Sequence, residues 1–317
     1  MKPTKRQVRA LGLCSGGLDS MLAALVLRRQ EIAVEWVTFE TPFFSSVKAR
    51  KASEITGVPL IVENITTEYL EMLRDPPAGY GKYMNPCMDC HTMMFRLAGK
   101  RMRKNGFDFL FSGEVLGQRP MSQTRPSLRY VEKHSGLIGY ILRPLSARKL
   151  PETIAEQNGL VDRGQLLDIS GRSRKPQIAL AKQFGISDFP APAGGCLLTD
   201  KGFSKRLADL FRYRPEAAAN EYHLLRYGRH FRLNPQSKLI VGRTQKDNEQ
   251  ILHYQDRRRD TVIKVKQYVG PIALLTGGGD ESVITLSASI CAGYSRAPNL
   301  VSVEVDVQTR QSRQSVK

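Results

Sequence analysis

The sequence of 317 residues is 41% hydrophobic and 25% charged, which is enough material for two folded domains or for one large domain with an appendage. Its 48 lysines and arginines outnumber 30 acidic residues, and the formal net charge of +18 predicts a polyanionic partner, nucleic acid before an anionic membrane surface. No apolar run approaches the roughly 20 residues of a membrane span, and the basic start shows no signal-peptide pattern. These features argue against an integral membrane protein, and we expect a soluble, cytoplasmic one.

Up to about residue 200, short β-rich runs alternate with helical ones. Strands are predicted at 9–14, 33–40, 58–65, 107–114 and 139–145. Helices are predicted at 18–29, 45–57 and 90–106, followed by two more amphipathic helices at 146–160 and 173–185. This alternation predicts an α/β fold, a doubly wound parallel sheet that binds ligands at the carboxyl ends of its strands.

Beyond residue 200 the pattern changes. A basic helical stretch at 201–228 is followed by β-rich segments at 238–244, 260–278, 282–294 and 300–307. Residues 201–317 hold 20 lysines and arginines against 11 acidic residues, which is half of the net charge. We therefore expect a second, smaller α+β domain that binds an anionic partner.

The chain has five cysteines, and an odd number argues against a disulfide framework. Cys14, in the first predicted strand, and Cys291, in an apolar run, are expected to lie in the core. The other three are candidates for metal, cluster or catalytic chemistry.

The stretch Ser15–Ser20 (SGGLDS) lies where the first predicted strand gives way to a helix. Glycines there let the backbone turn tightly and direct several N–H groups toward one point, and the helix N-terminus adds partial positive charge. This arrangement suits a phosphate group, with serine hydroxyls as further donors and an aspartate to orient nucleotide-bound Mg²⁺. The spacing matches neither the Walker loop nor the dinucleotide-binding pattern. The candidate phosphate-binding residues are Ser15, Gly16, Gly17, Asp19 and Ser20.

The same stretch resembles the SGGxDS signature of the PP-loop ATP pyrophosphatase superfamily. The resemblance implies binding of Mg-ATP, cleavage between its α and β phosphates and adenylation of a substrate oxygen, with Asp19 among the catalytic residues. A second stretch, SGEVLGQRPMSQT at 112–124, is expected to face that loop from the end of the fourth strand. We expect Gly113 and Gln118 from this stretch, and Phe39 at the end of the second strand, to contribute to the ATP site.

Three cysteines form a candidate metal-ligand set. Cys87 and Cys90 have CxxC spacing at the start of a predicted helix, and Cys196 lies in the stretch PAPAGGCLLTD. Three thiolates with an open corner suit a 4Fe-4S cluster that leaves one iron for exogenous sulfur. Two arrangements other than a cluster stay open at this point. One is zinc with His91 as a further ligand, and the other is a metal-free pair in which Cys90 and Cys196 act as nucleophile and persulfide carrier.

The combination of SGGLDS, YGKYMNPCMDCHTMM, SGEVLGQRPMSQT and YILRPLSARKLPETI is similar to the catalytic domain of the tRNA 4-thiouridine synthetase (ThiI) family. The resemblance, over roughly residues 8–200, implies that ATP adenylates a tRNA uridine and that sulfur then replaces the activated oxygen. Family members with a CxxC pair and a distant third cysteine are associated with an iron-sulfur cluster, and these positions correspond to Cys87, Cys90 and Cys196. The family's THUMP and rhodanese regions have no counterpart in this sequence, so we expect another segment to bind tRNA.

The stretches KLIVGRTQKDNEQILHY and DTVIKVKQYVGPIALL are similar to the RNA-binding domain of NFACT proteins. The residues agree with this, because basic side chains contact phosphates and rings such as those of His253 and Tyr254 stack on bases. The candidate RNA-binding residues here are Arg243, Lys246, Arg257, Arg258, Arg259, Lys264 and Lys266. In the first domain, a basic loop after residue 118 is expected to guide RNA through Arg119, Arg125, Arg129 and Lys133.

Together these features predict a PP-loop ATP-binding thiolase domain at 1–200, a helical linker at 201–235 and an NFACT-like RNA-binding domain at 236–317. The expected activity is tRNA uridine thiolation, at the 4-position, with ATP, Mg²⁺ and a 4Fe-4S cluster. The expected sulfur donor is sulfide or a cysteine desulfurase, and a homodimer is plausible. The alternatives are a 2-thiouridine synthetase, a non-catalytic RNA-binding or quality-control factor, and an ATP-dependent ligase that acts on a small molecule.

Overall fold

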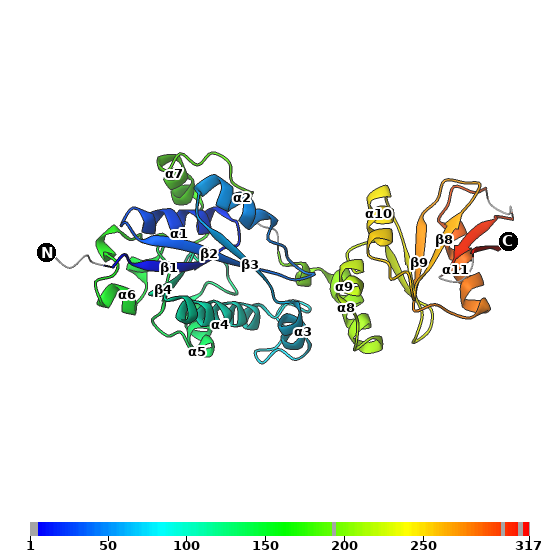
Figure 1. The fold of residues 1–317 in the computed structure, drawn as a ribbon, viewed down its shortest axis with the longest axis horizontal. Helices are drawn as coiled ribbons and strands as arrows, with labels where there is room; N and C mark the ends of the chain where they lie inside the picture. Colours follow the sequence, from blue (N-terminus) through cyan, green and yellow to red (C-terminus); the bar gives the residue numbers. More distant parts are fainter. Residues whose placement is uncertain (1–5, 192–194, 299–301, 310–312, 317) are drawn as a thin grey trace. The chain divides into compact units, whose positions relative to one another are not determined.

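The computed structural model of the chain describes residues 6–191, 195–298, 302–309 and 313–316. It divides into two compact units, Met1–Cys196 and Leu197–Lys317 (Figure 1). Among the described residues, none of the helices combines the length and the apolar character needed to cross a membrane.

The first unit is built on a parallel five-stranded sheet with the strand order β3-β2-β1-β4-β5. Its strands are β1 (Arg9–Leu13), β2 (Ala33–Glu40), β3 (Leu60–Asn64), β4 (Phe109–Ser112) and β5 (Ile141–Leu142). Its helices are α1 (Leu18–Arg28), α2 (Val47–Thr56), α3 (Thr66–Arg74), α4 (Cys87–Asn105), α5 (Arg125–Ser135), α6 (Ile154–Gln157) and α7 (Lys175–Gln183), with short 3-10 helices at Ala147–Lys149 and Arg163–Gln165.

Helices cover both faces of this sheet. Helices α1, α2 and α7 pack together on one face, and α4 and α5 pack together on the other (Figure 1). The sequences of β1 and β4 are nearly continuous apolar runs, because both faces of these strands are buried. The predicted doubly wound α/β fold is confirmed, and the direction of winding reverses between β1 and β4.

The second unit contains a six-stranded antiparallel sheet with the order β11-β10-β8-β9-β7-β6. Its strands are β6 (Arg229–Arg232), β7 (Lys238–Val241), β8 (Thr261–Val265), β9 (Ile272–Thr276), β10 (Val305–Gln308) and β11 (Arg313–Val316). Its helices are α8 (Lys201–Tyr213), α9 (Ala219–Leu224), α10 (Gln245–His253) and α11 (Glu281–Gly293), preceded by a 3-10 helix at Leu197–Thr199.

Alternate residues of this sheet serve two hydrophobic clusters. Leu239 and Val241 face the cluster that includes residues of α11, whereas Ile240 between them faces a cluster with Leu224 of α9 and Ile251 of α10. Both faces are therefore covered, and the predicted second α+β domain is confirmed.

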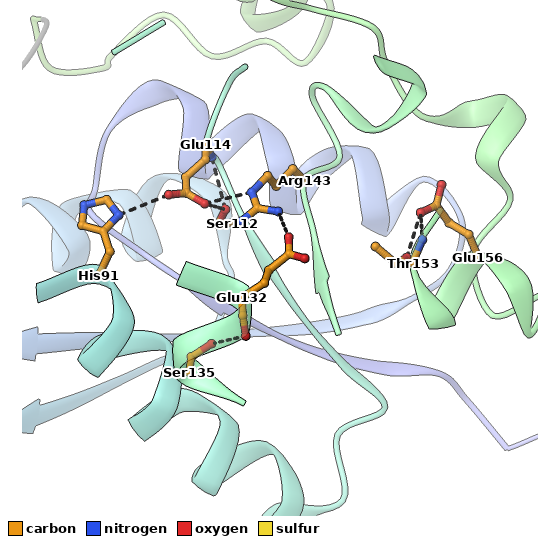
Figure 2. Close-up of polar contacts among 8 residues, drawn as sticks. All are labelled: His91, Ser112, Glu114, Glu132, Ser135, Arg143, Thr153 and Glu156. Carbon is orange, nitrogen blue, oxygen red and sulfur yellow. Dashed lines mark hydrogen bonds and ion pairs between the residues drawn. The ribbon is translucent and has the colours of Figure 1, made fainter. Parts of the chain in front are cut away.

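Two predicted elements were wrong. Residues 146–160 form no single amphipathic helix, because Pro151 separates the 3-10 turn from the short α6, which Thr153 and Glu156 cap reciprocally (Figure 2). Residues 282–294, predicted as β-rich, form helix α11. Asp280 caps this helix by accepting a hydrogen bond from the Val283 amide, so capping and tertiary packing override β-branched propensity.

Helices α3, α5 and α10 were not predicted. Helix α5 begins after Thr124, whose hydroxyl oxygen accepts a hydrogen bond from the Ser127 amide, and Pro126 lies in its first turn. Residues 125–133 are therefore helical, not a loop as expected. Strand β10 overlaps only the end of the strand predicted at 300–307. Residues 300 and 301 of that prediction lie outside the described residues.

Candidate active site

The loops after β1 and β4 meet at the carboxyl edge of the parallel sheet. Gly113 follows β4 directly, and a Cβ atom placed on it would lie 2.5 Å from the amide nitrogen of Ser20 and from the carbonyl carbon of Asp19. Only a glycine lets the two backbones approach this closely. The structure thus brings the two signature stretches together where the winding of the sheet reverses, the usual place for a ligand in such folds.

The SGGLDS loop exposes backbone amides at the start of α1. Gly16 has φ +72° and packs against the backbone of Lys48, where a Cβ would come within 2.2 Å of the carbonyl carbon. Gly17 is the N-cap residue of α1, and no side chain among the described residues caps that helix. The first backbone amides of α1 are therefore available to an anion, as the sequence predicts.

The two serines of the loop differ in role. The Ser20 hydroxyl is buried and donates to the Gly17 carbonyl over 2.7 Å, so it holds the turn closed. Ser15 is exposed, and its hydroxyl oxygen accepts a hydrogen bond from the Gly17 amide over 3.4 Å. Phe39 is buried near the end of β2.

Asp19 is held by a side-chain amide. Gln118 Nε2 donates to Asp19 Oδ2 over 2.7 Å, whereas Asp19 Oδ1 is buried without a hydrogen-bond partner among the described residues. Burial raises the pKa of Asp19, although the Gln118 hydrogen bond and the charge of Arg174 partly oppose this. An orphaned carboxylate oxygen of this kind fits a hard cation such as nucleotide-bound Mg²⁺. Sequence reasoning found both Asp19 and Gln118 but missed Arg174.

The CxxC pair lies at the start of α4, as the sequence predicts for this helix. Cys87 is its first residue, and Cys90 follows one turn later. Burial alone would raise the pKa of Cys87, but a hydrogen bond with His91 and the His91 charge lower it. Burial and the neighbouring charges of Cys196 and Cys87 raise the pKa of Cys90 far above its ordinary value. The environment therefore favours the thiolate form more at Cys87 than at Cys90.

All three candidate cysteines lie near one phenol. Burial raises the pKa of Tyr69, and the charges of Cys90, Cys196 and Cys87 raise it further. Cys196 itself is exposed. Three cysteine sulfurs near one another supply the kind of soft ligand that an iron-sulfur cluster needs, once they are deprotonated. Within the described ranges, however, no three His, Cys, Asp or Glu side chains are arranged to hold a metal ion, so both the cluster and the zinc alternative remain predictions.

A largely buried ion-pair network joins His91, Glu114, Arg143 and Glu132 (Figure 2). His91 Nδ1 lies 3.2 Å from Glu114 Oε1, and Glu114 Oε2 accepts a hydrogen bond from Arg143 Nε over 3.0 Å. A second nitrogen of Arg143 contacts Glu132 of α5, and the Arg143 side chain is only 3% exposed. His91, Glu114 and Arg143 come from three of the stretches that the sequence singles out, whereas Glu132 comes from none of them.

The network shifts the pKa values of Glu114 and His91 in opposite directions. Burial alone would raise the pKa of Glu114, but the Arg143 charge and the His91 hydrogen bond lower it to about 2. Burial alone would lower the pKa of His91, but hydrogen bonds with Cys87 and Glu114 raise it to about 10. An imidazolium therefore lies between a carboxylate and the Cys87 sulfur. Sequence reasoning considered His91 only as a zinc ligand and assigned no role to Glu114 or Arg143.

The basic residues predicted to guide RNA in this unit are exposed. Arg125, Arg129 and Lys133 recur every fourth residue of α5 and so lie along one side of that helix. Arg119 precedes the helix, and its positive charge lowers the pKa of both Asp19 and Cys87. At Asp19 this partly offsets the effect of burial, and at Cys87 it adds to the effect of His91. Arg119 is thus near both the nucleotide loop and the CxxC pair.

In the second unit the predicted RNA-binding residues fall into two groups. Arg243 donates to Asp247 over 2.7 Å, and Lys266 donates to Glu304 over 2.8 Å, so both are partly engaged within the protein. The other basic residues are exposed, with no ion pair among those described: Lys246, Arg257, Arg258, Arg259 and Lys264.

The two predicted stacking residues, His253 and Tyr254, already contact other rings. The Tyr254 ring stacks on the His223 ring, with centroids 4.5 Å apart and planes 5° from parallel. The Tyr227 ring also stacks on Tyr254, with centroids 6.2 Å apart. His253 contacts Tyr254 edge-on.

Comparison with known families confirms both resemblances. Residues 5–157 match the family model of the thiamine biosynthesis protein ThiI, and residues 228–317 match that of the NFACT protein RNA binding domain. Cys196 and helix α7 lie outside both matched segments.

Curated relatives match only part of the chain. A probable tRNA sulfurtransferase of a Thermoanaerobacter species is 34% identical over 155 residues, 46% of this chain and 39% of the relative. Another from Lactobacillus gasseri is 30% identical over 168 residues, 49% of this chain and again 39% of the relative. The chain therefore spans about two fifths of the length of these relatives. A solved 4-thiouridine synthetase–RNA complex with bound ATP is 21% identical, with a TM-score of 0.43 over 61% of this chain and 46% of that one.

Proposed function

We propose that this chain is an ATP-dependent tRNA sulfurtransferase that adenylates a tRNA uridine and replaces the oxygen at its 4-position with sulfur. The ThiI family match over residues 5–157 and the tRNA sulfurtransferase relatives support this proposal. The match to an RNA binding domain over residues 228–317 supports RNA as the partner.

One observation carries the proposal: two consecutive residues connect the nucleotide loop to the CxxC pair. Gly113 packs against the backbone of Asp19 and Ser20, while Glu114 binds His91, which in turn binds Cys87. An adenylating site and a sulfur-transfer site need to act on the same base, so this adjacency fits the paired chemistry.

In the first step we assign the amides of the SGGLDS loop and Asp19 to the triphosphate and its Mg²⁺. The uridine oxygen attacks the α phosphorus, an O–P bond forms, and the bond to the β phosphate breaks as pyrophosphate leaves. Charge stabilisation by preorganised N–H groups and by the cation supplies most of the rate enhancement in such transfers. Arg119, near Asp19, provides further positive charge for the departing pyrophosphate.

In the second step sulfide attacks the activated base carbon, a C–S bond forms, and the C–O bond breaks as AMP leaves. We assign Cys87, Cys90 and Cys196 as the residues that would hold a 4Fe-4S cluster. When bound, such a cluster supplies an iron without a protein ligand, where exogenous sulfur can bind. The Glu114–Arg143 pair orients His91, and His91 holds the Cys87 sulfur in place.

We assign tRNA binding to the second unit and to the basic side of α5. Exposed arginines and lysines neutralise phosphates, and half-buried rings such as Tyr254 offer stacking surfaces for unpaired bases. We keep the division into a catalytic domain at 1–200, a linker at 201–235 and an RNA-binding domain at 236–317 as part of this proposal.

The test is thiolation by the purified protein. The protein, isolated without oxygen, is incubated with unmodified tRNA, ATP, Mg²⁺ and sulfide, and the tRNA is digested for nucleoside mass spectrometry. We expect 4-thiouridine and stoichiometric AMP. Formation of 2-thiouridine would move the reaction to the other carbon. Binding of tRNA without any thionucleoside would overturn the enzyme proposal in favour of an RNA-binding factor.

Iron and acid-labile sulfide analysis tests the cluster. We expect about four irons per chain in the wild type, lost in Cys87→Ala and retained in Cys291→Ala, which removes a buried cysteine of the second unit. An iron-free protein that thiolates tRNA with a persulfide-loaded cysteine desulfurase as donor, and not with sulfide, would move the sulfur to a cysteine persulfide.

A further inference from the structure

Helix α7 contributes a fully buried polar side chain to the nucleotide edge. Gln177 has no exposed surface, and α7 packs against α1, whose first turn carries Asp19. Gln177 lies beyond residues 5–157, which the ThiI family model matches, and no motif in the sequence singles it out. A glutamine buried this completely needs a reason for its polar atoms.

The side chain of Gln177 continues the hydrogen-bond chain that holds Asp19. Gln177 Nε2 donates to Gln118 Oε1 over 2.8 Å, and Gln118 Nε2 donates to Asp19 Oδ2 over 2.7 Å. An amide group has one donor end and one acceptor end. Because Gln118 accepts from Gln177 with its oxygen, its NH₂ group must face the carboxylate. Gln177 therefore sets the orientation of Gln118, and Gln118 holds Asp19 Oδ2. Gln177 also acts on Asp19 directly, through a side-chain hydrogen bond that lowers the pKa of Asp19.

Two buried oxygen atoms at this place have no hydrogen-bond partner among the described residues: Asp19 Oδ1 and Gln177 Oε1. Both are acceptors, so they repel a phosphate oxygen and attract a cation or a donor group. Carboxylate and amide oxygens are the ligands that Mg²⁺ prefers, either directly or through its water molecules. The arginines whose charges act on Asp19, Arg174 and Arg119, provide the complementary attraction for the anionic phosphates.

We propose that Gln177 is a positioning residue for a bound Mg²⁺–nucleoside triphosphate, holding Gln118 so that Asp19 Oδ1 faces the cation, with Gln177 Oε1 as a second acceptor. This inference rests on the proposed function, because it assumes that the SGGLDS loop binds ATP. It extends the nucleotide site to a helix that the sequence analysis left without a role.

The test separates the Mg²⁺-dependent part of ATP affinity from the rest. ATP binding to the full chain is measured by isothermal titration in Mg²⁺ and again in EDTA, for the wild type and for Gln177→Leu, which keeps the side-chain size but removes both polar atoms. Loss of an orienting residue near a metal typically lowers affinity by at least about tenfold, so we expect the Mg²⁺/EDTA affinity ratio to fall by about that factor. Affinity in EDTA should change little.

Two further variants keep the result interpretable. Gln118→Met breaks the same chain from a less buried position, and it should lower the same ratio if Gln177→Leu fails to fold. Gln183→Leu makes the matched change at an exposed position of α7 and should leave the ratio unchanged. Equal losses in Mg²⁺ and in EDTA, or an unchanged ratio in folded Gln177→Leu, would overturn the inference. A wild-type protein that binds no ATP in either condition would instead overturn the proposed function.

Discussion

The two units use charged residues in different ways. At the carboxyl edge of the first sheet, Glu114 contacts both Arg143 and His91, and the Arg143 charge and the His91 hydrogen bond lower the pKa of Glu114. In the second unit, lysines and arginines such as Lys246 and Arg257 are exposed around a sheet whose two faces are both filled with apolar side chains. The excess of basic residues therefore serves two purposes: a few charges build a site, and many provide a surface for a polyanion.

This difference predicts that removing a buried charge from the first unit causes the largest loss in the free energy of unfolding. Arg143→Met leaves Glu132 without its cation and Glu114 with His91 alone, and breaking a buried pair typically costs about 3–5 kcal/mol. Trp36 is the only tryptophan of the chain and is buried in β2, so its fluorescence during urea unfolding reports on this unit alone.

The matched control is Arg148→Met in the same unit. Arg148 pairs with Asp168 over 3.6 Å, and the two side chains are 47% and 61% exposed. The loss in the free energy of unfolding for Arg148→Met should stay within about 0.5 kcal/mol. If Arg143→Met and Arg148→Met lost the same free energy of unfolding, the buried network would stabilise the protein no more than a surface ion pair does.

The glycines of the nucleotide loop allow a second test. In Gly16→Ala the added methyl group meets the Lys48 backbone at 2.2 Å in a left-handed conformation, and overpacking of this kind costs roughly 1–3 kcal/mol. Gly57→Ala is the control, because Gly57 also has positive φ but nothing within 4 Å of the added atom. Urea unfolding by Trp36 fluorescence should separate the two variants, and only Gly16→Ala should weaken ATP binding.

Asp209 is one of several carboxylates in the second unit that form ion pairs, and its pKa adds a test by pH to the comparison. Burial alone would raise the pKa of Asp209, but hydrogen bonds from Arg232 and Lys238 lower it from 3.8 to about 2. Because the folded value is depressed, this stabilisation is present above about pH 4 and is lost as pH falls toward 2. Because the Asp209 carboxylate is partly exposed, solvent screening reduces its contribution to stability to roughly 1 kcal/mol.

Hydrogen exchange of peptides from residues 229–241 at several pH values measures this effect. The wild type should lose protection between pH 4 and 2, whereas Asp209→Asn should start less stable and show a flatter profile. Glu216→Gln, an exposed acid of the same unit, should keep the wild-type profile. Parallel profiles for all three proteins would contradict the role of Asp209.

The smallest change in stability is expected for the exposed charges, whose effect should appear in RNA binding. Lys264 is exposed on β8, whereas Lys266, two residues later, is paired with Glu304. Lys264→Gln should reduce the salt slope of tRNA binding by about 0.7–0.9, as for one lost phosphate contact, and Lys266→Gln by less. Filter binding across a salt series measures both slopes. A larger effect from Lys266 would show that its ion pair opens when RNA binds.

Local signals in the sequence were sufficient for much of the fold. The alternating apolar runs correctly placed β1, β2 and β4, and the glycines of SGGLDS marked the turn before α1. They failed at α11, where a β-branched run becomes a helix because a cap and the neighbouring strands stabilise it. They also missed α5, although Thr124 and Pro126 are a helix-start signal that could have been used.

The sequence by itself determined the doubly wound class of the first unit, the glycine turn before α1 and the spacing of the CxxC pair, because each depends on neighbours along the chain. Only the tertiary structure decided that Arg143, Glu114 and His91 form one network and that Gln177 reaches Asp19 through Gln118. Such contacts join residues that are distant in sequence. Their charge states and hydrogen bonds depend on burial and on partners that the order of residues alone does not specify.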